Sequence, residues 1–190
     1  MSTGSMIFLG LLVAAFLYAV MLYNSLVQLK NDVAKAWANI DVVLKQRHDE
    51  IPKLVEVCKQ YKQFEQSTLQ AVIEARSRVQ TAREQQNVPA LNQAEGALRT
   101  GLGQIFAVAE AYPDLKANDN FMQLQQRITS LESTIADRRE LYNDSVNLNN
   151  IRVESFPDSV LAGMFGFQDK PLLEFAESEK ADVDVKQLFN

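Results

Sequence analysis

The chain opens with one continuous apolar stretch and then changes to regularly spaced apolar positions. The stretch covers residues 6–23, and no charged side chain occurs before Lys30. A helix needs roughly 20 apolar residues to cross about 30 Å of hydrocarbon, and a lone span is helical because lipid offers its backbone no hydrogen-bond partner. The pattern therefore predicts a membrane-spanning helix, with residues 1–23 as a short N-terminus and anchor.

A cleaved secretory signal is the alternative interpretation of this stretch. Such a signal has a basic start, a shorter apolar core and a cleavage site made of small residues. Here residues 1–5 carry no side-chain charge, and Tyr23 and Asn24 stand at the downstream boundary. These features favour a retained anchor.

Four residues near the end of the stretch are candidates for the membrane interface. Tyr18 and Tyr23 have amphipathic rings that favour the headgroup level, and Lys30 and Lys35 follow on the near flank. Positive residues close to a span tend to stay in the cytoplasm. We therefore expect a domain on the cytoplasmic face of a bacterial inner membrane and an external N-terminus, although only two lysines support this orientation.

Beyond the anchor, apolar residues recur at steps of three and four, which is the signature of a helix with one buried stripe. The stripe has a polar turn at Arg47 and His48, and Pro52 lies inside it. An interior proline removes a backbone hydrogen bond and either bends a helix or restarts it. The pattern otherwise predicts helix through residues 24–86, ending at Asn87 and Pro89.

Two further helices follow. The first, at about residues 89–111, contains Gly96, Gly101 and Gly103, small residues that allow neighbouring helices to approach closely. The second starts after a cap at Asn118 or Asp119 and keeps its three-and-four spacing for over six turns before Phe156 and Pro157. Because the connections are short, we expect an all-α, antiparallel up-and-down bundle of the four-helix, coiled-coil-like type over residues 24–155.

The tail, residues 156–190, is apolar first and acidic later. Its first half carries Leu161, Met164, Phe165 and Phe167, which is too apolar for a disordered segment. We expect it to dock on its own bundle, on a neighbouring subunit or on the membrane interface.

Charge excludes one class of partner. The net charge is −5, divided as +2 over residues 24–86, −3 over 87–154 and −4 from residue 155 onward. A nucleic-acid binder needs a concentrated basic face that releases counterions from phosphate, and none is visible. We therefore expect no nucleic-acid partner. The single cysteine, Cys58, excludes an intramolecular disulfide.

The sequence offers no recognisable catalytic or metal constellation. His48 is the only histidine, and its helical neighbours at three and four residues are apolar or basic. Cys58 belongs to the apolar stripe and is interpreted as a core residue. Paired carboxylates could meet in space, but their spacing does not predict it. We expect no enzymatic activity, no cofactor and no small-molecule substrate.

Two polar clusters remain as candidate partner surfaces. One is the turn with Tyr112, Asp114 and Lys116, and the other is a set on the last helix: Arg138, Arg139, Tyr142 and Asn143. The alternative interpretation treats the first as a capped turn and the second as a buried polar layer.

Several motifs in register resemble the LemA family of bacterial membrane proteins over essentially the whole chain. They are Tyr23-Asn24-Ser25-Leu26-Val27, Ala36-Trp37-Ala38-Asn39-Ile40-Asp41-Val42 with Leu44 and Arg47, Ile51-Pro52 with Leu54-Val55, Glu74-Ala75-Arg76, Tyr112-Pro113-Asp114-Leu115-Lys116-Ala117 with Phe121 and Leu124-Gln125, Arg139 with Tyr142-Asn143-Asp144, Phe156-Pro157 and Gly166-Phe167.

This resemblance implies a single-pass protein with a short external N-terminus, a cytoplasmic antiparallel helical bundle and no catalytic residues. A relative in magnetotactic bacteria is linked to building magnetosome membranes, which suggests membrane organisation. We therefore expect a membrane-anchored, non-enzymatic scaffold that contacts the lipid bilayer and forms a homo-oligomer or recruits another membrane protein. The alternative is a regulatory adaptor for a membrane protease or transporter.

Overall fold

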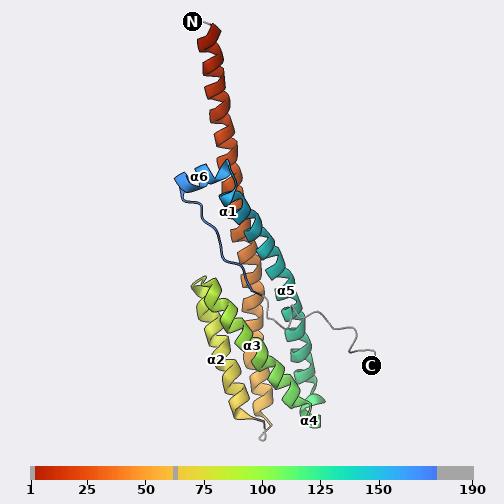
Figure 1. Ribbon diagram of the computed structural model, residues 1–190. Coiled ribbons are helices and arrows are strands. Elements are labelled where there is room, and N and C mark those ends of the chain that lie inside the picture. Colours follow the sequence, from red (N-terminus) through yellow and green to blue (C-terminus); the bar gives the residue numbers. More distant parts are fainter. Residues whose placement is uncertain (1–2, 62–63, 175–190) are drawn as a thin grey trace, which may run out of the picture. The chain divides into compact units, whose positions relative to one another are not determined.

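The computed structural model describes residues 3–61 and 64–174. Six elements occur in these residues, all of them helices and none a strand (Figure 1): α1 (Thr3–Lys59), α2 (Gln66–Glu84), α3 (Val88–Ala109), α4 (Pro113–Lys116), α5 (Asp119–Glu154) and α6 (Asp158–Phe165). The expected all-α fold is confirmed. The acidic end of the tail, residues 175–190, lies outside the described residues.

The chain divides into two compact units, and the long helices α1 and α5 each contribute to both. Unit 1 is formed by Met1–Val42 and Ile135–Leu172. Unit 2 is formed by Val43–Thr134 together with Leu173 and Glu174 from the described part of the tail.

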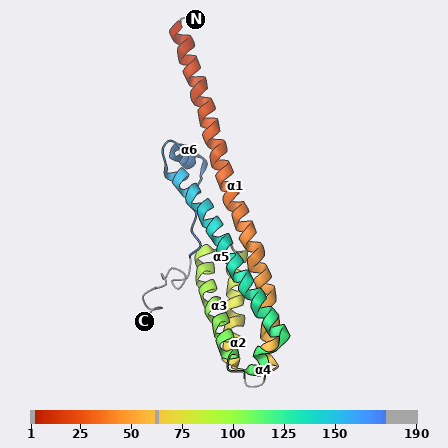
Figure 2. The ribbon, with the colours of Figure 1, turned by 90° about the vertical axis from the view of Figure 1, so that its right-hand side faces the viewer.

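Unit 1 contains the apolar first part of α1, the last part of α5, and α6. Both ribbon views show the end of α5 beside α1 (Figures 1 and 2). Leu26, Val33 and Ile40 of α1 are buried, as are Ile135 and Val146 of α5. The three-and-four spacing of these residues places them on one face of each helix, so the predicted stripes meet inside this unit.

Unit 2 is an up-and-down bundle of four helical segments: residues 43–59 of α1, α2, α3, and residues 119–134 of α5. Its centre is filled by side chains that the spacing predicts to be buried, among them Leu44, Leu54, Val72, Leu98, Ile105 and Ile128. A buried aliphatic side chain contributes roughly 1.5–3 kcal/mol relative to an exposed one.

Helix α1 continues through Pro52 without a restart. Proline has no N–H, so the carbonyl of His48, four residues earlier, loses its helical partner. Arg76 of α2 supplies a replacement, because its Nε donates a 2.9 Å hydrogen bond to that oxygen. Of the two alternatives that the sequence left open, a break at Pro52 is therefore wrong.

The break occurs instead between Lys59, the last residue of α1, and Gln66, the first residue of α2, where the sequence predicted uninterrupted helix. The backbone N–H of Tyr61 donates to the carbonyl of Cys58 at 3.1 Å, a tightened turn that ends α1. Phe64 is buried and its ring centroid lies 5.9 Å from that of Tyr112. The reversal brings α2 back along α1 and buries a stripe that a single long helix would leave exposed to water.

Two predicted helix boundaries carry the side-chain caps that they need. The Asn87 side chain accepts a hydrogen bond from the Ala90 N–H at 3.1 Å and starts α3. The Asn118 side chain accepts from the Phe121 N–H at 3.1 Å and starts α5, which confirms the predicted cap. Both satisfy a backbone donor that the first helical turn leaves without a partner.

The described part of the tail folds against its own chain. Gly166 ends α6 in the left-handed conformation (φ 71°), which a residue without Cβ adopts readily. Asn150 then pairs with the Lys170 backbone, donating to its carbonyl at 2.9 Å and accepting from its N–H at 2.8 Å. The Tyr142 hydroxyl donates to the Pro171 carbonyl at 3.3 Å.

Candidate functional site

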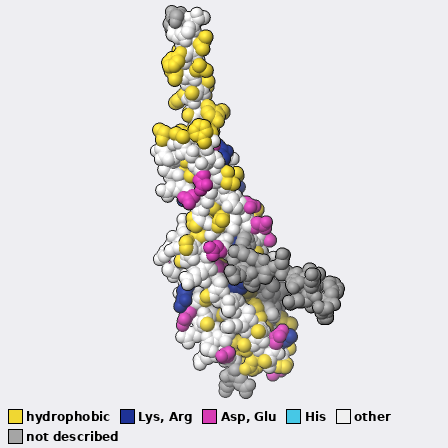
Figure 3. Space-filling model, viewed as in Figure 1, with side chains coloured by type: hydrophobic (Ala, Val, Ile, Leu, Met, Phe, Trp, Pro, Cys, Tyr) yellow, Lys and Arg dark blue, Asp and Glu magenta, His cyan; other side chains and the backbone are white. Residues whose placement is uncertain are grey.

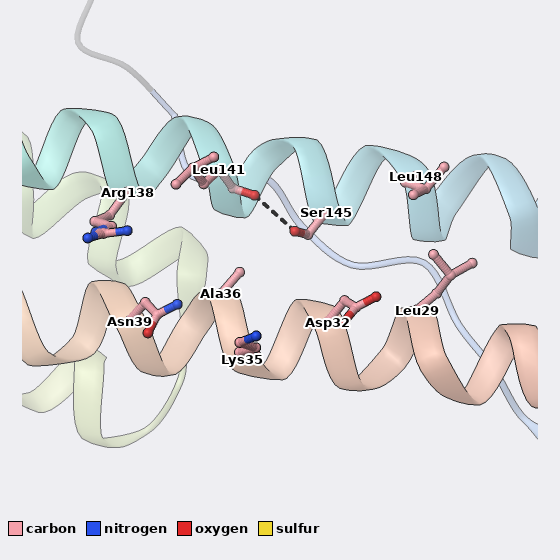
Figure 4. A pocket seen from close by; sticks show the side chains of 9 residues that line it. All are labelled: Leu29, Asp32, Lys35, Ala36, Asn39, Arg138, Leu141, Ser145 and Leu148. Atoms are coloured by element: carbon pink, nitrogen blue, oxygen red, sulfur yellow. Dashed lines mark hydrogen bonds between the residues drawn. The ribbon is translucent and has the colours of Figure 1, made fainter.

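One concave feature of unit 1 is a groove between α1 and α5. It encloses about 310 Å³. Figure 4 shows its nine lining side chains, which come from both helices: Leu29, Asp32, Lys35, Ala36 and Asn39 of α1, and Arg138, Leu141, Ser145 and Leu148 of α5. The hydroxyl of Ser145 donates to the Leu141 carbonyl at 2.9 Å, so this side chain is satisfied within its own helix.

The groove presents apolar side chains at a helical repeat. Leu29 and Ala36 are seven residues apart on α1, and Leu141 and Leu148 are seven apart on α5. Leu141 and Leu148 are each 52% exposed. Asp32, Lys35 and Arg138 add charges of both signs along the edges. A surface of this composition suits the apolar face of another amphipathic helix better than a small polar ligand.

The structure brings two predicted site residues together in this groove and buries two others. Lys35 and Arg138 both line it, although the sequence assigned them to different surfaces. Arg139 and Tyr142 are buried, and the Tyr142 ring lies 5.7 Å from that of Trp37 in an edge-on contact. Burial raises the pKa of Tyr142. Asn143, the fourth member of the set, is half-buried.

A second groove, of about 370 Å³, lies where the apolar stretch ends. Tyr23 and Lys30, two of the predicted interface residues, line it together with Phe165, Phe167 and Lys170. The Tyr23 ring contacts both phenylalanines edge-on, with centroid distances of 4.8 Å to Phe165 and 5.9 Å to Phe167. Tyr18 is exposed on α1 and is not part of the lining.

The predicted surface at the Tyr112 turn is held by backbone and ring contacts. The Tyr61 hydroxyl donates to the Asp114 carbonyl at 3.2 Å, and the Asn118 amide donates to that hydroxyl at 3.5 Å. The Tyr112 ring packs on Phe64. The side chains of Asp114 and Lys116 remain exposed and available to a partner.

Unit 2 contains a buried charge cluster that the sequence did not reveal. The Arg47 side chain is 0% exposed and pairs with Glu95 through Nη2 and with Glu132 through Nη1, the latter at 2.7 Å. Arg99 Nε lies 3.6 Å from the second Glu132 oxygen. Burial opposes the charged form of Arg47, but the two carboxylates outweigh it and raise its pKa above the ordinary value.

A local signal for this cluster was present. Each member occupies a stripe position: Arg47 falls between Leu44 and Ile51, Glu95 between Leu91 and Leu98, and Glu132 between Ile128 and Ile135. A charged residue at such a position is almost never buried unless it is paired. One positive and two negative residues in three stripes were therefore candidates for one another.

The geometry assigns this cluster a structural role. The arginine stays protonated at every physiological pH, so it cannot exchange a proton with a substrate. Arg47 Nε, Glu95 Oε2 and Glu132 Oε2 are buried without a hydrogen-bond partner in the described chain. Leaving polar atoms in that state costs stability, and the cluster is best explained as a device that fixes which helix faces meet.

Other candidate chemical groups are isolated. Within residues 3–61 and 64–174, no group of three or more His, Cys, Asp or Glu side chains lies close enough to hold a metal ion. Cys58 is fully buried, and burial raises its thiol pKa to about 11. A thiol in this state is a poor nucleophile at neutral pH.

The amino-acid sequence is similar to one protein family and to several individual bacterial proteins. The LemA family model matches residues 36–187. Magnetosome protein MamQ 2 of Paramagnetospirillum magneticum is 30% identical over 100 residues, which are 53% of this chain and 37% of that protein. Protein LemA of Metamycoplasma hominis is 26% identical over 168 residues, 88% of this chain and 75% of that protein. Magnetosome protein MamQ of Magnetospirillum gryphiswaldense is 23% identical, covering 92% of this chain and 72% of that protein.

Proposed function

Because the chain belongs to the LemA family of membrane-associated helical proteins, we propose that it is a non-enzymatic scaffold, anchored by the first part of α1, that joins copies of itself or another membrane protein at the bacterial inner membrane. The observation that carries this proposal is the state of that helix. Every residue from 3 to 18 is exposed, and α1 is the one described helix long and apolar enough to cross a membrane.

An exposed apolar helix of this length is unfavourable in water. Soluble monomers rarely expose continuous apolar patches larger than a few hundred Å². Figure 3 shows hydrophobic side chains gathered over the first part of α1. In a bilayer the same side chains contact acyl chains of matching polarity, which supports an anchor that spans the membrane once.

The groove between α1 and α5 in unit 1 supports the scaffold function. Leu141 and Leu148 leave apolar surface uncovered beside α1, and the adjoining charges can select a helix of complementary sign. The occupant that fits is an amphipathic helix from a second copy or from another membrane protein. Two of the relatives described above are magnetosome proteins by name, and the family is membrane-associated, so we extend the proposal to a role in membrane organisation.

The proposed orientation places the helical units in the cytoplasm and the residues before the span outside. Lys30 and Lys35 follow the apolar stretch, and positive flanks tend to remain cytoplasmic. No ligand, cofactor or nucleic acid is required.

Photocrosslinking of the full chain in membranes tests the groove. A photoreactive phenylalanine replaces Leu141 or Leu148 in the groove, and Asn147, exposed on α5 but outside the lining, is the matched control. The expected result is a discrete adduct from both leucine positions and none from Asn147. Equal yields at all three positions would contradict a defined occupant.

The mass of the adduct separates the two forms of the proposal. A species of twice the chain mass means self-assembly, and a single foreign membrane protein means recruitment. The adaptor alternative uses the Tyr112 turn, where Asp114 and Lys116 are exposed. A photoreactive residue at Lys116 in the same experiment decides it: a unique adduct with a protease or transporter from that position, with no adduct from the groove, supports the adaptor.

A further inference from the structure

Helix α6 has its polarity reversed relative to a helix of a soluble protein. Its buried positions are Asp158 and Ala162, four residues apart on one face. The exposed positions are large and apolar: Val160 is 54% exposed, Met164 is 73% and Phe165 is 57%, and the preceding Phe156 is 82%. A surface helix normally turns its apolar face inward. Water is therefore an unfavourable environment for the exposed face of α6.

Specific polar contacts fix α6 in this orientation. Arg152 at the end of α5 holds Asp158 with two parallel bonds, Nε to Oδ2 at 3.1 Å and Nη2 to Oδ1 at 2.8 Å. The hydrogen bond that Arg152 donates to the Asp158 carboxylate raises the pKa of Arg152. Beyond the helix, Asn149 donates to the Gln168 carbonyl at 3.2 Å. Bidentate arginine–carboxylate pairs add geometric specificity, so the outward apolar face is a built feature.

The apolar face of α6 adjoins the end of the proposed membrane span. Phe165 contacts Tyr23, the last residue of the apolar stretch. From Met6 to Tyr23 the helix rises roughly 27 Å, about the thickness of the hydrocarbon core. Tyr23 therefore marks the level at which α1 leaves the acyl chains, and α6 lies at that level.

The direction of α6 fits a helix that lies in the plane of a membrane. In Figure 1 α6 runs transverse to α1, and in Figure 2 it is seen nearly end-on beside α1, so it does not run along that helix. The only charged side chain of α6, Asp158, is neutralised by Arg152. Lys30 and Lys170 line the adjoining groove, where phosphate headgroups of a bilayer would be within reach.

We propose that α6 is an interfacial membrane helix, with Phe156, Val160, Met164 and Phe165 inserted at the boundary between headgroups and acyl chains. The occupant of this face is lipid. The argument is continuity: the outer face of α6 extends the apolar surface of the span, and a helix in the interface plane with its apolar face down is a known mode of membrane binding. This inference rests on the proposed span, so its test must distinguish the two.

Quenching of tryptophan fluorescence by brominated phosphatidylcholine provides that test. The full chain, reconstituted in such vesicles, has Trp37 as its only tryptophan, about 21 Å beyond Tyr23 along α1. Met164→Trp reports on α6, and Val160→Trp reports on the same face at a second position. Phe16→Trp lies inside the span, and Val42→Trp is an exposed control in unit 1.

The expected result is strong quenching of the fluorescence of the introduced tryptophan in Met164→Trp, Val160→Trp and Phe16→Trp. We expect no quenching of the introduced tryptophan in Val42→Trp, nor of Trp37 in the parent chain. Quenching at Phe16→Trp without quenching at either α6 position would leave the span intact and overturn the interfacial helix. A second copy that covered α6 would give this same result, because it would keep lipid away from both positions. Absence of quenching at Phe16→Trp would overturn the span and this inference with it. Quenching at Val42→Trp equal to that at Met164→Trp would also overturn it.

Discussion

Arg47 shows at the scale of single residues how this protein selects one arrangement of its helices. Its partners Glu95 and Glu132 are 48 and 85 residues away in sequence. Apolar side chains pack in many registers with similar energy, whereas a buried guanidinium is satisfied only where both carboxylates reach it. We interpret the cluster as a specificity device in unit 2 and expect its removal to affect stability strongly.

Replacing Arg47 with alanine tests this interpretation. Arg47→Ala removes the cation that Glu95 pairs with and leaves Glu132 with Arg99 alone, at 3.6 Å. We expect a loss of about 3–5 kcal/mol in the free energy of unfolding, measured by denaturant titration of the detergent-solubilised protein. The matched control is Arg127→Ala: this arginine pairs with Glu50 at 2.8 Å but its side chain is 63% exposed. Its loss should stay under about 1 kcal/mol.

Restoring charge balance should recover much of the stability. In Arg47→Met combined with Glu95→Gln, one positive and one negative charge are removed together and Glu132 keeps Arg99, so the double variant should be more stable than Arg47→Ala alone. If Arg47→Ala were no more destabilising than Arg127→Ala, the cluster would not be holding the helices together.

At the scale of elements, close approach of α2 and α3 depends on one glycine. The sequence predicted three glycines at a tight contact, but a Cβ at Gly96 or Gly103 would meet nothing within 4 Å. A Cβ at Gly101 would lie 2.7 Å from Val72 Cγ2. Val72 is fully buried, and its β-branched side chain has little rotational freedom in a helix.

Gly101→Ala should therefore destabilise the protein by about 1–3 kcal/mol through overpacking, although alanine is the better helix former. Gly103→Ala on the same helix should stabilise by up to about 1 kcal/mol, because it gains helix propensity without a clash. Thermal unfolding followed by circular dichroism compares the two. Adding Val72→Ala to Gly101→Ala should cost less than the sum of the two single effects. Additive effects, or equal behaviour of both glycines, would show that this contact is not tight.

Helix ends marked by a capping residue were predictable, because caps act over three or four residues, whereas the end of α1 at Lys59 was missed. Asn118 was a predicted cap and acts as one, and Asn87, predicted only as the end of the preceding helix, caps the next. The path of the chain at Pro52 was not readable, since the deciding partner, Arg76, lies 28 residues away. The position of α6 likewise depends on Asn149 and Asn150, whose partners Gln168 and Lys170 lie 19 and 20 residues away.

At the scale of the whole molecule, the membrane span predicts a fixed orientation that labelling can measure. Val42→Cys should react with a membrane-impermeant maleimide only after bacterial cells are permeabilised, because the helical units are proposed to face the cytoplasm. Thr3→Cys, on the other side of the span, should react in intact cells. Native Cys58 contributes little background, since its thiol is buried with a pKa raised to about 11.

The two positions control for each other, because each reports on a side that the other does not. Labelling of Val42→Cys but not Thr3→Cys in intact cells would reverse the proposed orientation. Labelling of both in intact cells would rule out a span between them.

The sequence by itself determined the apolar stretch, the all-helical fold, the helix caps and the resemblance to the LemA family. These features depend on composition and on spacings of three to seven residues, which act locally and survive in any arrangement of the helices. Tertiary structure alone decided that the chain reverses between α1 and α2, that Arg76 completes α1 at Pro52, that Arg47 joins two distant carboxylates, and that α6 turns its apolar side chains outward. Each of these depends on contacts between residues far apart in sequence, such as Tyr23 with Phe165 for α6, which periodicity does not encode.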